Sequence, residues 1–214
     1  MYETQIAIER HSRSAVPGVV RTQAICALAA VAATLPIASV GNGGSLAVPP
    51  DAPGNLRAPA DQVVSVEALA SGFQIYECQS KVDKPSTYEW TFVAPDAVLL
   101  DQSGRLLGRH YAGPTWESID GSSVTGEAKA RDPGSNPSSI PWLLLTAKST
   151  AGAGVFSATK SIQRLQTVGG VAPAEPCSAA NAEQVAEVPY TATYYFYRPA
   201  ENARPVPWAG ADKY

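Results

Sequence analysis

The amino-acid sequence predicts an all-β protein, a single-domain β-sandwich or closed barrel of about eight to ten short strands with one short helix. Short stretches alternate apolar and polar residues, most clearly residues 88–93, Tyr-Glu-Trp-Thr-Phe-Val. The 17 glycines and 18 prolines are scattered along the chain, as expected for strands joined by many turns. No internal repeat, no alternation of strand with helix and no long linker between two cores is found.

The charge of the chain argues against nucleic acids as partners. It carries 16 Lys and Arg against 19 Asp and Glu, a formal charge of −3. Nucleic-acid binding needs clustered basic side chains, and none cluster beyond the first residues. The negative balance also argues against anionic surfaces.

Residues 1–45 are predicted to be a signal peptide and leader. Arg10, Arg13 and Arg21 precede an apolar run over residues 24–35, which is too short to span a bilayer as a helix, and small residues follow. We therefore expect a secreted or periplasmic protein with no membrane span in its mature form. The alternatives are a later translation start, near residues 19–20, and a retained N-terminal membrane anchor.

The cysteines predict one disulfide. Cys26 lies in the apolar run and would be removed with the leader, which leaves Cys78 and Cys177. A bridge between them would close a loop of about a hundred residues, for which the chain-entropy model gives ~4–5 kcal/mol of stabilisation. Two free buried thiols are the alternative, which export disfavours.

Past the leader, residues 46–59 are rich in Pro, Ala and Gly and are predicted to be an extended linker. A β domain with an irregular C-terminal tail is predicted over residues 60–214. Its expected strands, in order, are residues 63–69, 73–79, 88–93, 98–100, 105–111, 116–119, 124–130, 140–148, 155–168 and 190–198.

The breaks between these strands follow from turn-forming residues. Ser71-Gly72 and Pro95-Asp96 are expected to end strands. Between Ile75 and Tyr76 the apolar phase shifts, which indicates either a strand covered on both faces or a bulge.

The later connections are predicted in the same way. Residues 101–104, Asp-Gln-Ser-Gly, form the turn of a β-hairpin, and Ala-Gly-Pro at 112–114 and Asp-Gly at 120–121 reverse the chain. Residues 131–139 are a polar loop. The one predicted helix covers residues 178–187, with Ser178 as its cap.

The candidate binding residues lie in one stretch, residues 104–126. It contains His110, the single histidine outside the leader, followed by Trp116, Glu117 and Asp120. A His–carboxylate pair acts as an acid–base couple or as two metal ligands, but a metal site needs three or four ligands, so we predict no metal and no cofactor. The alternative is that His110 is structural and bonds Glu117 or a backbone group.

Trp116 beside Glu117 and Asp120 suits the binding or hydrolysis of a glycan, because sugars stack on aromatic rings and two carboxyl groups cleave glycosidic bonds. The alternative places Trp116 in the core and Asp120 in its Asp-Gly turn. A serine hydrolase is not indicated, because no G-x-S-x-G motif occurs and one histidine would have to serve every role. The cysteines lack C-x-x-C spacing, and residues 151–154 lack the lysine and helix of a phosphate loop.

Five segments together resemble one family. They are residues 72–78 (GFQIYEC), 88–92 (YEWTF), 110–117 (HYAGPTWE), 120–126 (DGSSVTG) and 162–170 (IQRLQTVGG). The order is similar to that of the domain of unknown function 3455 family of secreted bacterial and fungal proteins, over nearly all of residues 59–198. The resemblance implies export and one domain, and no activity. Some relatives carry a malate dehydrogenase label, which this sequence does not support because it has no G-x-G-x-x-G after a strand.

We therefore expect an exported, non-catalytic ligand-binding or envelope-associated β domain whose partner is a small molecule or a glycan. The alternative is a carbohydrate-active hydrolase that uses Glu117 with Asp120 or His110. A third interpretation is a purely structural or interaction protein.

Overall fold

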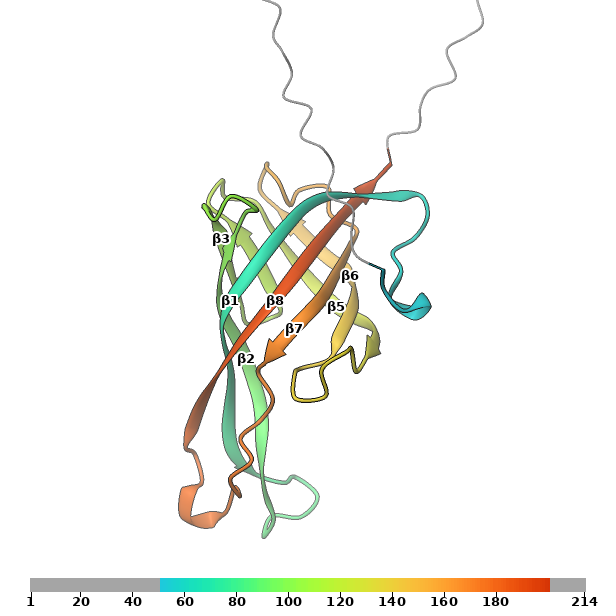
Figure 1. The fold of residues 1–214 in the computed structure, drawn as a ribbon. Helices are drawn as coiled ribbons and strands as arrows, with labels where there is room; N and C mark the ends of the chain where they lie inside the picture. Colours follow the sequence, from blue (N-terminus) through green and yellow to red (C-terminus); the bar gives the residue numbers. More distant parts are fainter. Residues whose placement is uncertain (1–50, 201–214) are drawn as a thin grey trace, which may run out of the picture. The chain divides into compact units, whose positions relative to one another are not determined.

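A computed structural model describes residues 51–200 of the chain, which form one closed barrel of eight antiparallel strands (Figure 1). The strands follow the chain order, and β8 closes the barrel by pairing with β1. The strands are β1 (Gln62–Ser80), β2 (Tyr88–Leu100), β3 (Leu106–Tyr111), β4 (Thr115–Ser118), β5 (Ser123–Asp132), β6 (Trp142–Ala151), β7 (Ser161–Gly169) and β8 (Val185–Pro199). The all-β prediction is confirmed, and of its two architectures the structure adopts the barrel.

The predicted helix over residues 178–187 is wrong. Only a single turn of 3-10 helix, η2 (Ala179–Asn181), forms there, and β8 begins at Val185. Ser178 stands at the N-cap position of this turn, and its backbone N–H donates to Asn181 Oδ1 at 2.7 Å. The turn goes no further because residues 185–189 pair with the end of β1, and strand pairing outweighs the helix preference of the local sequence.

Two predicted breaks are also wrong, since β1 runs through Gly72 and β2 runs through Pro95. A side chain at Gly72 would place its Cβ 2.1 Å from the Asp96 carbonyl oxygen, so the glycine permits close strand approach and makes no turn. Pro95 is tolerated because β3 pairs with β2 only from Ala97 onward, so no strand needs its missing N–H on that side. Of the two alternatives for the phase change between Ile75 and Tyr76, the structure shows the register shift of a bulge.

The connection before β7 differs from its prediction as well. Residues 155–168 were expected to be one strand, but β7 begins at Ser161. Phe156 is fully buried on the preceding turn and packs against Phe196 of β8, with ring centroids 4.5 Å apart. Phe156 therefore fills space in the barrel core and does not belong to a strand.

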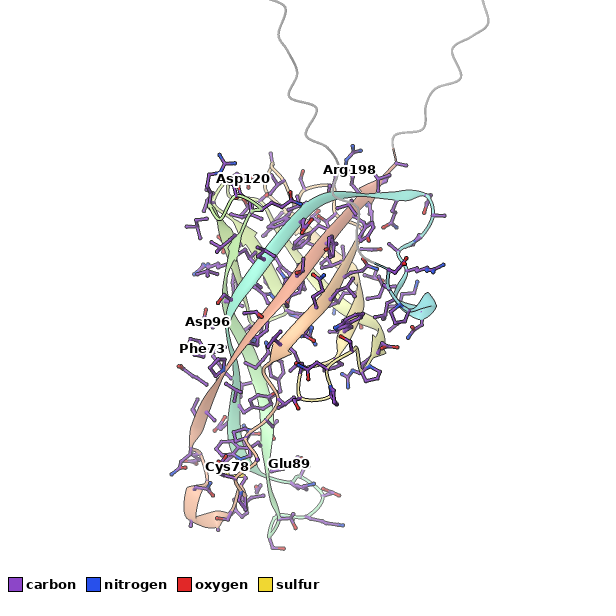
Figure 2. All side chains as sticks on the ribbon, viewed as in Figure 1. Phe73, Cys78, Glu89, Asp96, Asp120 and Arg198 are labelled. Carbon is purple, nitrogen blue, oxygen red and sulfur yellow. A yellow bond between two sulfur atoms is a disulfide. The ribbon has the colours of Figure 1, made fainter. Side chains whose placement is uncertain are left out.

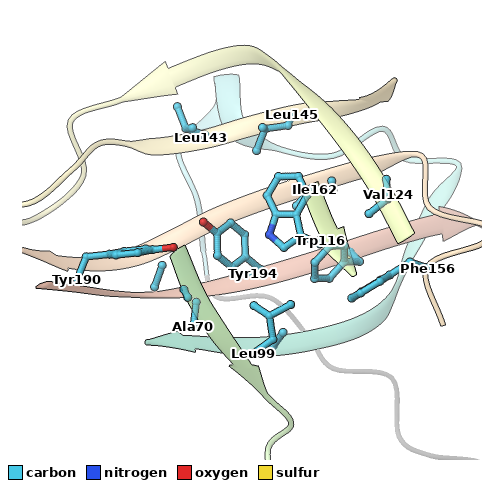
Figure 3. Packing of buried hydrophobic residues seen from close by; sticks show 14 of the residues in the cluster. Ala70, Leu99, Trp116, Val124, Leu143, Leu145, Phe156, Ile162, Tyr190 and Tyr194 are labelled. Carbon is cyan, nitrogen blue, oxygen red and sulfur yellow. The ribbon is translucent and has the colours of Figure 1, made fainter. Parts of the chain in front are cut away.

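The barrel interior forms the main core (Figure 3). Trp116 of β4 lies between Leu145 on one wall and Leu99 on the opposite wall, and Tyr194 of β8 packs beside it. Gly126 of β5 makes room for the indole, because a Cβ there would come within 3.0 Å of the Trp116 ring.

A second cluster lies on the outer face of the barrel. The segment around η1 (Gly54–Leu56) packs on it, and Leu56 is fully buried against Leu144, Leu165 and Tyr195. Gln163 donates a hydrogen bond of 2.6 Å to the Leu56 carbonyl oxygen, which fixes the segment to β7. Residues 51–58 of the predicted linker are thus part of the packed structure.

The predicted disulfide joins Cys78 to Cys177, whose Cα atoms are 5.6 Å apart. It lies in an extension formed by residues 73–80 of β1, 88–96 of β2 and 185–189 of β8, which project past β3 and β4 (Figure 2). Trp90 donates its indole N–H to the Glu175 carbonyl oxygen at 2.9 Å. The bridge and this hydrogen bond fasten the β7–β8 connection to the extension.

The predicted signal peptide, its cleavage site and the tail beyond residue 200 lie outside the described residues. Within residues 51–200, no helix has the length and apolar character needed to cross a membrane.

Candidate functional site

The candidate site is a cavity of about 460 Å³ at the end of the barrel where the β3–β4 turn lies. We call it the mouth cavity. Its exposed lining residues are Phe92, Val93, Gly113, Glu127, Ala128 and Lys148, and Pro114 is half-buried. Its buried or half-buried lining residues are Gln74, Pro95, His110, Trp116, Gly126, Leu143, Leu145, Arg164 and Tyr194.

The strand lengths explain why the barrel opens here. β3 ends at Tyr111 and β4 begins at Thr115, while β2 and β5 both continue past this hairpin. The last pairs are Ala97 with His110 on one side and Thr115 with Thr125 on the other. Beyond them, no strand of the described chain pairs with β2 or β5 on these sides, and the gap between them leads into the interior.

His110 and Trp116 form the part of the lining that the hairpin contributes. They are register partners on β3 and β4, both point inward, and their rings stack with centroids 4.3 Å apart. Tyr194 meets both rings edge-on, at 5.2 Å from His110 and 5.3 Å from Trp116. The three rings make a rigid floor.

His110 is held as a neutral imidazole. Its Nδ1 lies 2.9 Å from the Thr115 carbonyl oxygen, which only accepts, so Nδ1 carries the proton and Nε2 is an acceptor. Burial lowers the pKa of His110 to about 3, the hydrogen bond to Thr115 opposes this, and the charge of Arg164 adds to it. The side chain is therefore uncharged at any physiological pH.

Several buried polar atoms at the cavity have no hydrogen-bond partner. Among residues 51–200, six buried side-chain polar atoms lack a partner, and three of them belong to lining residues: Gln74 Nε2, Trp116 Nε1 and the Tyr194 hydroxyl. The Tyr190 hydroxyl, which neighbours Tyr194, is a fourth. Each such group costs about 1–3 kcal/mol, so their concentration at one cavity needs a functional explanation.

Arg164 supplies positive charge to the cavity from β7. It lies two residues after Ile162, on the inward face of the strand. Its Nε and Nη2 donate to the Pro141 carbonyl oxygen at 3.2 and 2.8 Å. Within residues 51–200 the ion pairs are Lys81–Glu89, Arg105–Asp101 and Arg109–Glu117, so no carboxylate there pairs with Arg164.

Glu117 lies outside the barrel and does not face His110. Its register partner is Arg109, whose Nη2 lies 3.0 Å from the carboxylate, and the Tyr111 hydroxyl donates to the same oxygen at 2.9 Å. The hydrogen bond from Arg109, followed by that from Tyr111, lowers the pKa of Glu117. Residues one apart on a strand point to opposite faces, which separates Glu117 from Trp116.

Asp120 lies at the other end of β4, away from the mouth cavity (Figure 2). Its Oδ1 accepts from the Ser122 hydroxyl at 2.6 Å and the Ser122 N–H at 2.8 Å, and its Oδ2 accepts from the Val155 N–H at 2.9 Å. These bonds, the Ser122 hydroxyl first, lower its pKa to about 2. Asp120 thus ties the β4–β5 turn to the loop before β7.

Of the four predicted site residues, the structure brings His110 and Trp116 together at the cavity and places Glu117 and Asp120 elsewhere. Sequence reasoning missed Gln74, Arg164 and Tyr194. Arg164 lies two residues after Ile162 and so shares one face of the strand with it, and a charged residue on the same face as a core residue was the sequence signal that would have found it.

No metal site emerges from the part of the chain that the structure describes, where no three His, Cys, Asp or Glu side chains group together.

Comparison with known proteins supports one relationship. A family model described as "Protein of unknown function (DUF3455)" matches residues 59–198, which is nearly the whole described barrel. No curated protein and no solved structure matches the chain.

Proposed function

Because this chain belongs to the family described as protein of unknown function (DUF3455), whose description names no activity, we propose a function from the site itself: an exported barrel that binds a small organic molecule in the mouth cavity without transforming it. The protein would act in the cell envelope or outside the cell.

The observation that carries this proposal is the set of unpaired buried polar atoms at the cavity. Gln74 and Tyr194 expose 3% and 1% of their surface, and both line the cavity with polar atoms that form no well-aligned hydrogen bond, although Tyr190 lies close to both side chains. Small-molecule sites combine apolar walls with a few fixed polar groups, in volumes of roughly 300–1,000 Å³, and mouths of β-barrels are a recurrent place for them. The mouth cavity has these properties.

The residues of the cavity argue for binding rather than catalysis. No Ser, Thr or Cys lines it, and the lining side chains of Glu127 and Lys148, which could serve as nucleophiles, are exposed at the entrance. His110 is neutral and its Nδ1 is committed to the Thr115 carbonyl oxygen, with no carboxylate to orient it as a base.

The hydrolase alternative lacks geometric support. Glu117 is paired with Arg109 on the outer face, Asp120 holds a turn at the far end of β4, and His110 lies inside. These three groups cannot act on one glycosidic bond. Trp116, of which 1% is exposed, offers no open platform on which a sugar ring would stack.

Export is supported by the Cys78–Cys177 bridge, because disulfides persist in oxidising compartments, and by the basic, apolar and small-residue order of residues 1–45. Fractionation of the source cells tests this part: we expect the mature chain outside the cytosol, shortened by cleavage between residues 38 and 47. Full-length chain in the cytosol with reduced cysteines would contradict it.

Ligand binding is tested with a fragment library and disulfide-bonded protein, by ligand-observed NMR. Ala128 is an exposed lining residue on β5, so Ala128→Trp should narrow the cavity with little effect on folding. The matched control is Ala151→Trp, at an exposed alanine of β6 outside the lining. We expect hits that the first variant loses and the second keeps.

Equal loss or equal retention in both variants would contradict binding in the mouth cavity. Glu117→Gln should leave ligand binding unchanged and should not affect any hydrolysis of a glycan, since Glu117 lies outside the barrel. Glycan hydrolysis by the wild type that Glu117→Gln abolishes would instead establish the hydrolase.

A further inference from the structure

We infer that the ligand of the mouth cavity is an organic carboxylate with an apolar body, and that Arg164 binds its carboxylate group. This inference rests on the proposed function and adds the chemical class of the ligand.

The first argument is the charge of Arg164. The guanidinium lines the cavity and hydrogen-bonds a neutral acceptor, the Pro141 carbonyl oxygen, while no carboxylate of residues 51–200 forms an ion pair with it. A half-buried cation without a counter-charge is unfavourable, because burial removes its hydration. An anionic ligand would supply the missing charge.

The positive charge of Arg164 shifts the pKa of three side chains at or beside the cavity, His110, Tyr190 and Tyr194. Its charge favours the ionised form of the Tyr194 and Tyr190 hydroxyls, opposing the larger effect of burial, and it disfavours protonation of His110. These groups come from β3, β7 and β8, so the positive charge is directed at the interior rather than at bulk water.

The second argument is the kind of unpaired groups beside Arg164. Gln74 Nε2 is a pure donor, and the Tyr194 hydroxyl, which lies near Tyr190 and Arg164, forms no well-aligned hydrogen bond and can donate to a ligand. A carboxylate offers about four acceptor positions and takes two parallel N–H bonds from a guanidinium, so one carboxylate would satisfy several of these donors at once. A neutral glycan, which brings as many donors as acceptors, fits them less well.

The third argument is the apolar wall. Phe92 and Val93 of β2 leave 49% and 51% of their surfaces exposed at the entrance, and Pro114, Leu143 and Leu145 continue the wall inward. Large apolar side chains at an opening are normally covered when the site is filled. The body of the ligand is therefore apolar, either aromatic or a short acyl chain.

The charged groups at the entrance are Glu127 and Lys148, which are both exposed lining residues. They are of opposite sign and solvated, so they do not select for charge as Arg164 does. A matched control is Lys129 of β5, an exposed cation that lies outside the cavity lining.

The test compares matched acid and amide probes on disulfide-bonded protein: 3-phenylpropanoate against 3-phenylpropanamide, and hexanoate against hexanamide, with phenyl phosphate as a second anion. Dissociation constants come from calorimetry and from NMR shifts of indole N–H signals. We expect each acid to bind about ten- to a hundredfold more tightly than its amide, the range of a charge-assisted hydrogen bond.

Arg164→Met should abolish this preference for the acid, Arg164→Lys should keep part of it, and Lys129→Met, which removes an exposed cation outside the cavity lining, should leave it intact. Circular dichroism shows whether each variant folds, and if Arg164→Met does not, the Lys variant and the wild-type acid–amide ratio still decide. Equal binding of acid and amide, or an unchanged preference in Arg164→Met, overturns the inference.

The outcomes separate this inference from the proposed function. Neutral probes that bind as well as acids, and are lost in Ala128→Trp, leave the cavity as a binding site and overturn only the carboxylate assignment. Acid binding that Ala128→Trp does not affect places the site elsewhere and overturns both. Preference for phenyl phosphate over the carboxylates overturns the carboxylate and keeps the anion site. Failure of every probe to bind contradicts both proposals.

Discussion

His110 and Trp116 face each other across the β3–β4 hairpin, and their rings stack with centroids 4.3 Å apart and planes 7° apart. The stack lies inside the barrel, where His110 exposes 2% of its surface. Because the imidazole has lost its hydration there, its protonation and the stability of the barrel are linked.

The free energy of unfolding should decrease as the pH is lowered, because of His110. Its folded pKa is about 3, below the unfolded value of about 6.5, so only the unfolded state takes up the proton between these values. The contribution of neutral His110 to the free energy of unfolding is complete above pH 6.5 and is lost as the pH falls toward 3. Between pH 6.5 and pH 5 the loss is about 2 kcal/mol. Urea unfolding at both pH values measures it, and His110→Phe should remove that part of the decline. An equal decline in the variant would refute the assignment.

Tyr194→Phe should leave the unliganded barrel as stable as the wild type or slightly more stable, because it removes a buried hydroxyl that has no partner. It should also weaken ligand binding. Tyr197→Phe is the matched control on the same strand: its hydroxyl donates to Gln163 Oε1, so its loss should cost about 1 kcal/mol without affecting the cavity. Thermal unfolding checks the pair, and the reverse order of stability would count against the unpaired hydroxyl.

Gly72→Ala should destabilise the barrel by about 1–3 kcal/mol or more, because its Cβ would lie 2.1 Å from the Asp96 carbonyl oxygen and force β1 and β2 apart. Gly54→Ala is the control, since no atom lies within 4 Å of the Cβ added there. Chemical denaturation of both variants measures the difference. Similar stabilities would show that the two strands do not approach as described.

Replacing both Cys78 and Cys177 by Ala should lower the free energy of unfolding by roughly 2–5 kcal/mol, mainly through the unfolded chain, which the bridge constrains over 99 residues of separation. The barrel should still form, because the bridge lies in the extension and not in the main core. Far-ultraviolet circular dichroism and denaturation test this. Cys26→Ser should have no effect on the mature protein, and unchanged stability on reduction would argue against the bridge.

Much of the fold was predictable because strand alternation and turn residues are local signals. Tyr88–Val93 and the turns at Gly104 and Gly121 lie where expected, and the cysteine pairing is confirmed. The choice of a barrel over a sandwich was not predictable, because the pairing of β8 with β1 joins the two ends of the domain. Residues 178–187 were mispredicted for the same reason, since their structure depends on that distant partner.

Two of the four predicted binding residues, His110 and Trp116, line the mouth cavity. His110 and Trp116 stood out by residue type, and their spacing across a Gly-Pro turn does place them opposite each other. Glu117 was assigned to the same site because it is adjacent in sequence, yet one residue along a strand reverses the face. Arg164 and Gln74 belong to strands far away in the chain, so only the closed barrel shows that they share a cavity with His110.

The burial of Leu56 outside the barrel sets a limit on how far the chain can be shortened from its N-terminal side without exposing packed surface. Leu56 covers Leu144, Leu165 and Tyr195, and its carbonyl oxygen satisfies the Gln163 amide. A protease that cut after residue 58 would expose the apolar side chains under Leu56 and leave the Gln163 amide without its hydrogen bond. The exposed apolar surface would favour self-association of the shortened barrel. Expression designs should therefore keep the chain from before Ala52, and proteolytic nicking in this segment should be read as damage rather than maturation.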